Sequence, residues 1–459
     1  MDIFLHNSLS NKKELFKSIK KGSVGMYHCG PTVYNYPHIG NLRHFVLADL
    51  LRRLFEFNDY KVKQVINITD VGHIVGDIDD GEDKMEKSAR EEKKTSKQIA
   101  DFYTKVFMDN LVSLNINTNK TIFSKATEHI KDQIKLIKKL EKGGYTYNTS
   151  DGIYFDTKKF TDYGKLGNID IQGLKEGARV AINREKRNAT DFALWKFSPK
   201  GVVRELEWES PWGVGFPGWH IECSAMSMKY LGETFDVHTG GIDLIPTHHN
   251  GEIAQSECAT GKKFVNYWIH NAFVNFGEEK MSKSKGTFIR IEDLINKGFS
   301  PLSYRYLLLG SHYRTPMNFS ISALEGAENS FKKLINFIKS VGEKDGKILE
   351  NYKLEFQKAI NDDLNTSEAL SVLWKMIKDS SINDNDKKAT ILDFDKVLGL
   401  GLDSVKNDEV PKAISDLVRE REIERKEKNY KKSDELRKAI EAAGYSLEDS
   451  SEGPKISKK

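Results

Sequence analysis

The stretch GMYHCGPTVYNYPHIGN, Gly25–Asn41, begins as a short apolar strand that ends at Gly30-Pro31. Residues Phe45–Phe57 then repeat apolar side chains at helical spacing, and Val62–Ile68 has the pattern of a second strand. A strand, a helix and a second strand in this order predict a βαβ unit, whose two strands run parallel in one sheet. The first third of the chain is therefore expected to be α/β.

A more interrupted region follows this unit. Residues Asp77–Lys97 are densely charged, and we expect them to form a loop that leads into a helix continuing past Phe107. From Tyr145 to about Trp212 short strands alternate with turns and charged loops, whereas strand and helix patterns return at Gly218–Gly261. We therefore expect an insertion between two halves of the sheet.

The last third of the chain differs again, because it is almost wholly helical beyond Ser320. Residues Pro411–Lys459 are expected to form one long charged helix followed by a polar tail. A chain of 459 residues is too long for one compact core, and typical domain sizes suggest roughly three domains.

Composition and charge place few limits on function. The hydrophobic fraction of 38% and the charged fraction of 30% are typical of a globular protein with much solvated surface. Lysine and arginine, 71 in all, nearly balance 67 aspartates and glutamates, so the net charge of +4 is no strong nucleic-acid signature. No apolar run could span a bilayer and Met1–Asn11 lacks the pattern of a signal peptide, so we expect a cytoplasmic protein with no membrane partner. The three cysteines are too few for a disulfide framework, so reduced thiols that can bind a metal are expected. Cys29 and Cys223 are the candidates for metal binding, whereas Cys258 is expected to pack within a helix.

Two short segments have residues suited to phosphate binding. His38, Gly40 and Asn41 lie between a predicted strand and a predicted helix, where helix amides and a donor side chain can meet a phosphate. The segment KMSKSKG, Lys280–Gly286, suits a flexible loop whose lysines neutralise a polyphosphate. Taken alone, the first segment is more often a structural turn and the second a solvated basic loop.

Two cysteines, a histidine and a glutamate form a candidate metal site. Cys29 ends the first strand, and Cys223 lies in the segment GWHIEC. His248 and Glu252 are four residues apart, which places both on one face of a helix. Two thiolates, an imidazole and a carboxylate make a chemically sensible zinc site, although a single cysteine is more often a buried small side chain. His249 is the alternative ligand to His248.

The two phosphate-binding segments resemble, in the same order, the HIGH and KMSKS signatures of class I aminoacyl-tRNA synthetases. Four further segments resemble the cysteinyl-tRNA synthetases in particular, and these are Met26–Tyr34, Asn67–Asp70, Pro217–Met226 and His248–Ser256. The similarity runs nearly from end to end. The chain departs from the family where Asn41 replaces the last histidine of HIGH, where Thr247 precedes the two histidines, and in its tail.

This resemblance implies an α/β fold with a class I synthetase Rossmann-like parallel sheet and an inserted connective domain, followed by an α-helical bundle and a small C-terminal domain. It assigns residues 1–120 and 212–265 to the two catalytic halves and residues 121–211 to the connective insertion. Residues 266–325 are then the stem-contact region with the lysine loop, 326–403 the helical bundle, and 404–459 the C-terminal anticodon-binding region.

The resemblance also carries functional residues onto this chain. It implies zinc ligands at Cys29, Cys223, His248 and Glu252, and a cysteine pocket with Gly30, Thr69 and Trp219. It implies ATP-binding residues at His38, Gly40, Asn41, Gly240, Gly241, Asp243 and Lys283, and catalytic residues at His38, Asn41, Lys280 and Lys283. The expected cofactors are one Zn²⁺ per chain and Mg²⁺ with ATP. The expected partners are L-cysteine, ATP and tRNA(Cys), and the expected state is a monomer.

Zinc gives such an enzyme a means to tell cysteine from serine, which a shaped pocket separates poorly. The ion lowers the pKa of a thiol and binds the thiolate, whereas a hydroxyl is a far weaker acid and ligand. A rival interpretation is an ATP-dependent ligase joining cysteine to an amino sugar, but such an enzyme would not need the helical segment of about 140 residues after Ser320. A methionyl enzyme would carry a cysteine-rich zinc knuckle, which this sequence lacks. A non-catalytic RNA-binding protein would be expected to have lost the lysine signature, which is intact at Lys280–Ser284.

Overall fold

A computed structural model of the chain describes residues 1–72, 83–169, 185–199, 201, 204–276, 279–280, 288–341, 345–405, 411–450 and 453–458. Its centre is a five-stranded sheet with the order β11-β10-β3-β4-β5, in which all neighbours are parallel. The strands are β3 (Ser23–His28), β4 (Lys61–Ile68), β5 (Thr121–Lys125), β10 (Phe235–Gly241) and β11 (Val265–Asn271). The α/β fold with a parallel sheet is confirmed.

The βαβ unit expected from the first residues is present. Helix α1 (Ile39–Phe57) connects β3 to β4, and Met26 lies opposite Gln64 in the parallel pair. Side chains alternate across the sheet, because Met26 and Ile66 belong to one hydrophobic cluster and Tyr27 and Val65 to another. Both faces of the sheet are therefore covered, as is usual for a parallel sheet.

The strand order reverses in the middle of the sheet. The chain runs outward from β3 to β4 and β5 on one side, and later adds β10 and β11 on the other side. Helix α6 (Trp219–Leu231) precedes β10, and helix α7 (Asn250–Thr260) follows it. In open α/β sheets ligands bind beyond the carboxyl ends of the strands at such a reversal, so the ends of β3 and β10 mark the expected site.

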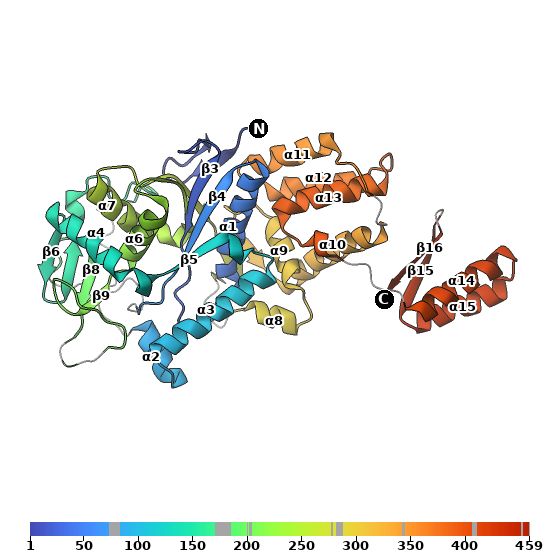
Figure 1. Ribbon diagram of the computed structural model, residues 1–459, viewed down its shortest axis with the longest axis horizontal. Coiled ribbons are helices and arrows are strands. Elements are labelled where there is room, and N and C mark those ends of the chain that lie inside the picture. Colours follow the sequence, from blue (N-terminus) through green and yellow to red (C-terminus); the bar gives the residue numbers. More distant parts are fainter. Residues whose placement is uncertain are drawn as a thin grey trace.

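The insertion is a separate antiparallel sheet, which lies beside the parallel one in Figure 1. Its strands are β6 (Thr146–Thr149), β7 (Gly152–Phe155), β8 (Phe192–Phe197) and β9 (Gly215–Pro217), and α4 (Ile130–Lys142) precedes it. The division of the chain into functional domains stays a prediction, and two of its boundaries place strands of the parallel sheet outside the predicted catalytic halves, β5 wholly and β11 except for Val265. β5 begins at residue 121 and β11 spans residues 265–271.

The charged stretch before Phe107 contains more helix than expected. Residues 77–82 of the expected loop lie outside the described residues. The rest of it contains α2 (Lys84–Glu92), because Asp83 accepts hydrogen bonds from the amides of Met85 and Glu86 and so caps the helix. Helix α2 ends at Lys93, and α3 (Ser96–Ser113) follows after a short turn.

The second half of the chain adds a small sheet and a helical bundle. The strands β12 (Val274–Phe276), β13 (Glu279–Lys280) and β14 (Met317–Phe319) form a three-stranded sheet, and β1 (Phe4–Asn7) and β2 (Lys12–Leu15) form an N-terminal hairpin. The helices are α8 (Ile291–Asn296), α9 (Pro301–Leu309), α10 (Ile321–Ser340), α11 (Glu350–Asn361), α12 (Thr366–Lys378) and α13 (Asp384–Leu398). Among the described residues, no helix is long and apolar enough to cross a bilayer.

The C-terminal segment is not one long helix with a polar tail, and that expectation was wrong. It folds as α14 (Lys412–Lys426), α15 (Tyr430–Ala442) and a hairpin of β15 (Tyr445–Ser450) and β16 (Gly453–Lys458). The helix breaks where Lys428 adopts a φ of 60°, in the left-handed region. These elements share a hydrophobic cluster of their own and lie apart from α10–α13 in Figure 1.

Candidate functional site

A cavity of about 670 Å³ opens at the carboxyl ends of β3 and β10, where the strand order reverses. It brings together most of the residues predicted from sequence. From those predictions the lining includes Cys29, Gly30, His38, Gly40, Asn41, Trp219, Cys223, Gly241, Asp243 and His248. Metal-binding, nucleotide-binding and amino-acid-binding candidates therefore share one cavity.

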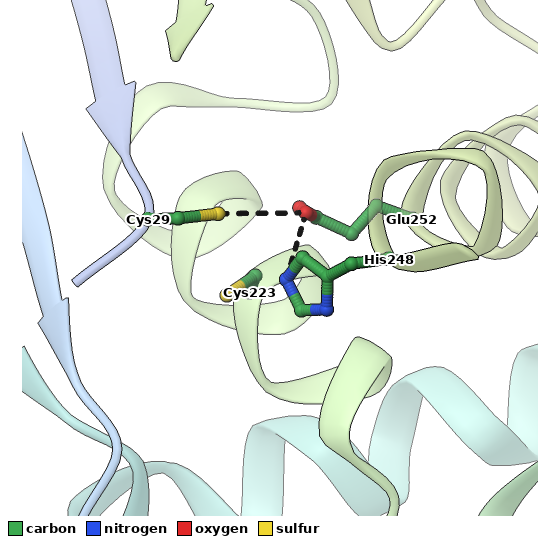
Figure 2. Close-up of side chains that lie close together, drawn as sticks. All are labelled: Cys29, Cys223, His248 and Glu252. Carbon is green, nitrogen blue, oxygen red and sulfur yellow. Dashed lines mark hydrogen bonds and ion pairs between the residues drawn. The ribbon is translucent and has the colours of Figure 1, made fainter. Parts of the chain in front are cut away.

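Four potential metal ligands converge at one end of this cavity. Cys29 follows β3, Cys223 lies on α6, His248 lies in the short π-helical turn Ile245–His249, and Glu252 lies on the first turn of α7. One ligand atom from each lies within 4.8 Å of all the others, and all four side chains are buried. Figure 2 shows the four side chains pointing toward one another from these separate elements.

The contacts within the cluster fit a metal-binding arrangement. His248 Nε2 is 3.1 Å from Glu252 Oε1, and the Cys29 thiol lies 3.9 Å from the same oxygen. Two sulfur atoms, one imidazole nitrogen and one carboxylate oxygen are the donor set that zinc accepts in tetrahedral sites. The residues present therefore fit a zinc ion.

Two further histidines orient these ligands, and sequence reasoning had given them no role. His220 Nδ1 lies 3.0 Å from His248 Nδ1, which leaves Nε2 of His248 facing the cluster. His238 Nε2 lies 2.9 Å from Glu252 Oε2, so the other oxygen of Glu252 faces the ligands. Partners of this kind fix the tautomer and orientation of metal ligands. His220 lies within the quoted segment Pro217–Met226, but nothing in sequence connects His238 to the cluster.

His249 belongs to a second, overlapping group. Cys29, His238, His249 and Glu252 also place ligand atoms within 4.8 Å of one another. His249 Nε2 is 3.3 Å from the Cys29 sulfur, and its Nδ1 is 2.7 Å from His270 Nε2. Burial, together with the neighbouring His238 and His270, lowers the pKa of His249 well below its usual value. His249 is therefore a neutral side chain packed behind Cys29.

Electrostatics at the cluster favour the anionic forms of two ligands. Burial would raise the pKa of Glu252, but His238 and His248 lower it to about 2. Burial would likewise raise the pKa of Cys223, but hydrogen bonds with Cys29 and His248 bring it to about 7. Burial would lower the pKa of His248, whereas Glu252 and Cys223 raise it to about 10. A bound cation would take the place of that histidine proton, since metal ligands must be deprotonated.

The predicted amino-acid pocket has two residues on the cavity wall and one behind it. Trp219 begins α6, and its ring centroid lies 4.3 Å from that of His248. Gly30 is required by close packing, because a Cβ atom there would lie 1.5 Å from the carbonyl oxygen of Asn67. Thr69 is 1% exposed and donates a hydrogen bond of 3.0 Å to the fully buried carboxylate of Glu222, another residue that sequence reasoning missed.

The turn that contains His38 caps helix α1. The Asn41 amide donates to His38 Nδ1 at 3.1 Å, and the His38 amide donates to Asn41 Oδ1 at 3.2 Å. This reciprocal pair is a capping box, so Asn41 has a structural role at the position where it departs from the HIGH signature. The turn also presents a helix N-terminus to the cavity, where phosphate binds readily.

The segment that follows the lysine loop, from Phe288 onward, lies next to the same turn. The Ile39 amide donates to the Ile289 carbonyl at 2.8 Å, and the ring centroids of His38 and Phe288 are 5.5 Å apart. The segment just after the loop is thus fixed to the histidine turn. Lys283 lies outside the described residues, and only the backbone of Lys280, in β13, is described.

The two glycines at the end of β10 differ in their surroundings. Gly241 and Asp243 line the cavity. At Gly240 an added Cβ would lie 2.4 Å from Cε1 of His249, so this glycine lets the strand pack closely against the histidine.

Comparison with known proteins agrees with this geometry. Residues 15–329 match the family model described as the class I (C) tRNA synthetase catalytic domain, and residues 355–402 match the DALR domain. Cysteine–tRNA ligase of Treponema denticola is 47% identical over 98% of this chain and 98% of its own length. Cysteine–tRNA ligase 1 of Burkholderia lata is 46% identical over 99% of this chain and 97% of its own length.

Solved structures show the same fold at much lower sequence identity. The crystal structure of Mycobacterium tuberculosis methionyl-tRNA synthetase bound by methionyl-adenylate superposes with a TM-score of 0.56. The match covers 82% of this chain and 90% of that chain at 14% identity. It supports the fold alone.

Proposed function

The chain belongs to the cysteinyl-tRNA synthetases, and we propose that Cys29, Cys223, His248 and Glu252 hold a zinc ion that selects cysteine by its thiol. As a class I cysteine–tRNA ligase, the protein binds ATP, cysteine and tRNA(Cys). The observation that carries the proposal is the convergence of the four ligand atoms at the wall of the substrate cavity. The rival interpretation as an amino-sugar ligase has no support among these relatives.

The substrate thiol would be read at this end of the cavity. A bound zinc ion lowers the pKa of a thiol and binds the thiolate strongly, whereas it binds a hydroxyl weakly. His220 and His238 hold His248 and Glu252 in place, and the Trp219 ring packs against His248. Trp219, Gly30 and Thr69 are the residues we assign to cysteine binding, with Thr69 acting from behind the wall.

The nucleotide would bind along the turn at the start of α1. His38, Gly40, Asn41, Gly241 and Asp243 line that part of the cavity. We assign His38, Asn41, Lys280 and Lys283 to catalysis. Their hydrogen-bond donors and positive charges would stabilise the negative charge that gathers on the phosphates of ATP during the reaction. We expect Mg²⁺ to accompany ATP. The cysteine carboxylate attacks the α-phosphate, a new P–O bond forms, and the bond to the departing pyrophosphate breaks. The terminal 2′-hydroxyl of tRNA then attacks the adenylate and releases AMP.

The remaining assignments concern the whole chain. We propose that residues 326–403 and 404–459 serve tRNA binding, and that the enzyme acts as a monomer in the cytoplasm. None of the three cysteines is in a disulfide, as we expect for a protein of a reducing compartment.

The test is cysteine-dependent ATP–pyrophosphate exchange combined with zinc analysis. We expect about one zinc per chain, exchange with cysteine, and none with serine. Cys223→Ser should lose both zinc and exchange, while Cys258→Ser, the matched control, should keep both. Full exchange in a zinc-free enzyme would overturn the proposal and would leave the nucleotide site intact.

A further inference from the structure

Three aromatic rings form a surface beside the substrate cavity, which we call the aromatic shelf and define as Tyr36, Phe102 and Tyr103. Each ring meets the other two edge to face, with centroids 5.0 Å apart for Phe102 and Tyr103, 5.1 Å for Tyr36 and Tyr103, and 6.1 Å for Tyr36 and Phe102. Tyr36 and Tyr103 line the cavity, whereas Phe102 lies beyond the lining and is 39% exposed. The shelf therefore leads from the surface into the cavity.

Two cations flank the aromatic shelf. The guanidinium carbon of Arg290 lies 4.8 Å from the centroid of Tyr36, and Nζ of Lys94 lies 4.6 Å from the centroid of Phe102. Both cations are ion-paired, Arg290 with Asp293 at 2.9 Å and Lys94 with Glu92 at 2.9 Å. The Glu92 carboxylate also accepts a hydrogen bond from the Tyr103 hydroxyl. These positions come from different segments, because Arg290 precedes α8 just after the lysine loop, whereas Lys94 lies in the turn between α2 and α3.

The shelf has the chemistry of a single-stranded nucleic-acid surface. Unstacked bases bind on aromatic rings and guanidinium planes, and nearby cations neutralise the phosphates. A single exposed aromatic side chain would need no explanation, but here an exposed ring is continuous with two cavity-lining rings and is flanked by positive charge. The family's reaction requires the single-stranded 3′ end of tRNA to enter this cavity.

We propose that the aromatic shelf, with Lys94 and Arg290, holds nucleotides of the single-stranded 3′ end of tRNA as that end enters the cavity. ATP is the other nucleotide of the reaction, but its candidate residues in the described part of the chain lie on the turn at the start of α1 and at or just after the end of β10. Phe102 lies outside that set. The inference rests on the family's tRNA-charging reaction and is independent of the zinc assignment.

Phe102→Ala tests the proposal on an exposed side chain. We expect the kcat/KM for tRNA in aminoacylation to fall about tenfold, since loss of one base–aromatic contact has an effect of this order. Cysteine-dependent ATP–pyrophosphate exchange should keep its rate, so that the loss is confined to transfer. Phe102→Tyr keeps an aromatic ring at this position and should therefore retain the kcat/KM for tRNA of the unmodified enzyme. Val112→Ala, at the far end of the same helix and 62% exposed, is the matched control and should leave aminoacylation unaltered.

A second variant tests the charged part of the surface. Lys94→Gln should weaken tRNA binding and reduce the slope of log KM for tRNA against log salt by about one, as for loss of one phosphate contact. Equal aminoacylation by Phe102→Ala and Val112→Ala would overturn the proposal. A parallel fall in exchange and aminoacylation in Phe102→Ala would also overturn it, because the shelf would then serve ATP or the fold. Failure of the zinc proposal would instead appear in the unmodified enzyme, as exchange with serine or as full exchange without zinc, and would leave the comparison of Phe102→Ala with Val112→Ala unaffected.

Discussion

His248 and His249 are adjacent in sequence, yet their side chains have different surroundings. His248 Nε2 faces Glu252 at 3.1 Å, and its other ring nitrogen meets His220. His249 is enclosed between Cys29 and His270. The first arrangement suits a metal ligand with an orienting partner, and the second suits a side chain that supports the cavity wall.

This difference predicts unlike effects of the two alanine variants. His248→Ala should lose bound zinc, because it removes one of the four donors. His249→Ala should retain zinc at the level of the unmodified protein while losing some stability through the cavity it creates. Elemental analysis of the two purified variants measures this. Zinc loss from His249→Ala with retention by His248→Ala would assign the ion to the other group of ligands.

At the scale of secondary structure, the site depends on a close approach of two neighbouring strand ends. The Gly30 amide donates to Asn67 Oδ1 at 2.7 Å, and the Asn67 side chain donates in turn to Thr69 Oγ1 at 3.0 Å. These contacts join the segment after β3 to the end of β4 and so fix the position of Cys29 beside the cavity. Any side chain at position 30 would separate them.

Gly30→Ala should therefore destabilise the protein by about 3 kcal/mol or more, because the added Cβ meets backbone that cannot move aside easily. Gly326→Ala is the matched control. Position 326 lies within α10, an added Cβ meets nothing within 4 Å, and alanine favours helix, so this variant should be as stable as the original or slightly more stable. Urea unfolding measures both changes. A Gly30→Ala protein of unaltered stability would contradict the close packing.

Local sequence predicted some elements well and others poorly. The unit β3-α1-β4 was predictable, because strand and helix periodicities were clear and a capping segment separated them. The break between α14 and α15 was not, since Lys428 carries no strong turn signal despite its positive φ. The proposed ligands were assigned from their donor chemistry and from the resemblance, whereas the contact of His238 with Glu252 depends on the folded arrangement of β10 against α7.

At the scale of the whole molecule, a buried ion-pair network joins the catalytic sheet to the helical bundle. Arg305 on α9 is fully buried and donates to Asp49 on α1 at 2.7 Å. It also donates to the Leu398 carbonyl at the end of α13 and to the Leu114 carbonyl after α3. The same carboxylate pairs with Arg53 at 2.7 Å. One aspartate thus compensates charge at the junction of several helices.

This network predicts a defined dependence of stability on pH. Burial would raise the pKa of Asp49, but Arg305, Arg53 and Arg52 lower it from 3.8 to about 2. A carboxyl whose folded-state pKa is lowered contributes stability above its unfolded pKa and loses it as the pH falls through the folded value. We expect a contribution on the order of 2 kcal/mol above pH 4, lost by about pH 2.

Asp49→Asn isolates this contribution from that of other carboxyls. The variant should be less stable at pH 7 by about 3–5 kcal/mol, because it leaves buried arginine charge uncompensated. The stability difference from the unmodified protein should shrink as the pH falls from 4 toward 2, which urea unfolding at several pH values measures. A difference that stays constant over this range would contradict the lowered pKa.

The C-terminal unit has its own hydrophobic cluster, with Ile414, Val418, Ile440, Tyr445 and Leu447. Its removal should therefore leave the catalytic body folded. A chain ending at residue 405 is expected to retain cysteine-dependent exchange and to lose most of its tRNA aminoacylation. Loss of exchange in the shortened chain would show that the catalytic body needs the C-terminal unit to fold or to act. Full aminoacylation by the shortened chain would show that tRNA binding does not need the C-terminal unit.

The central claim is that the cluster of Cys29, Cys223, His248 and Glu252 holds zinc and that zinc reads the sulfur of the substrate. Zinc-edge X-ray absorption of the enzyme, with no substrate, with cysteine and with serine, tests it most directly. We predict two sulfur neighbours at about 2.3 Å without substrate and one more with cysteine only. A sulfur count that is the same in all three samples would contradict selection of cysteine by the metal.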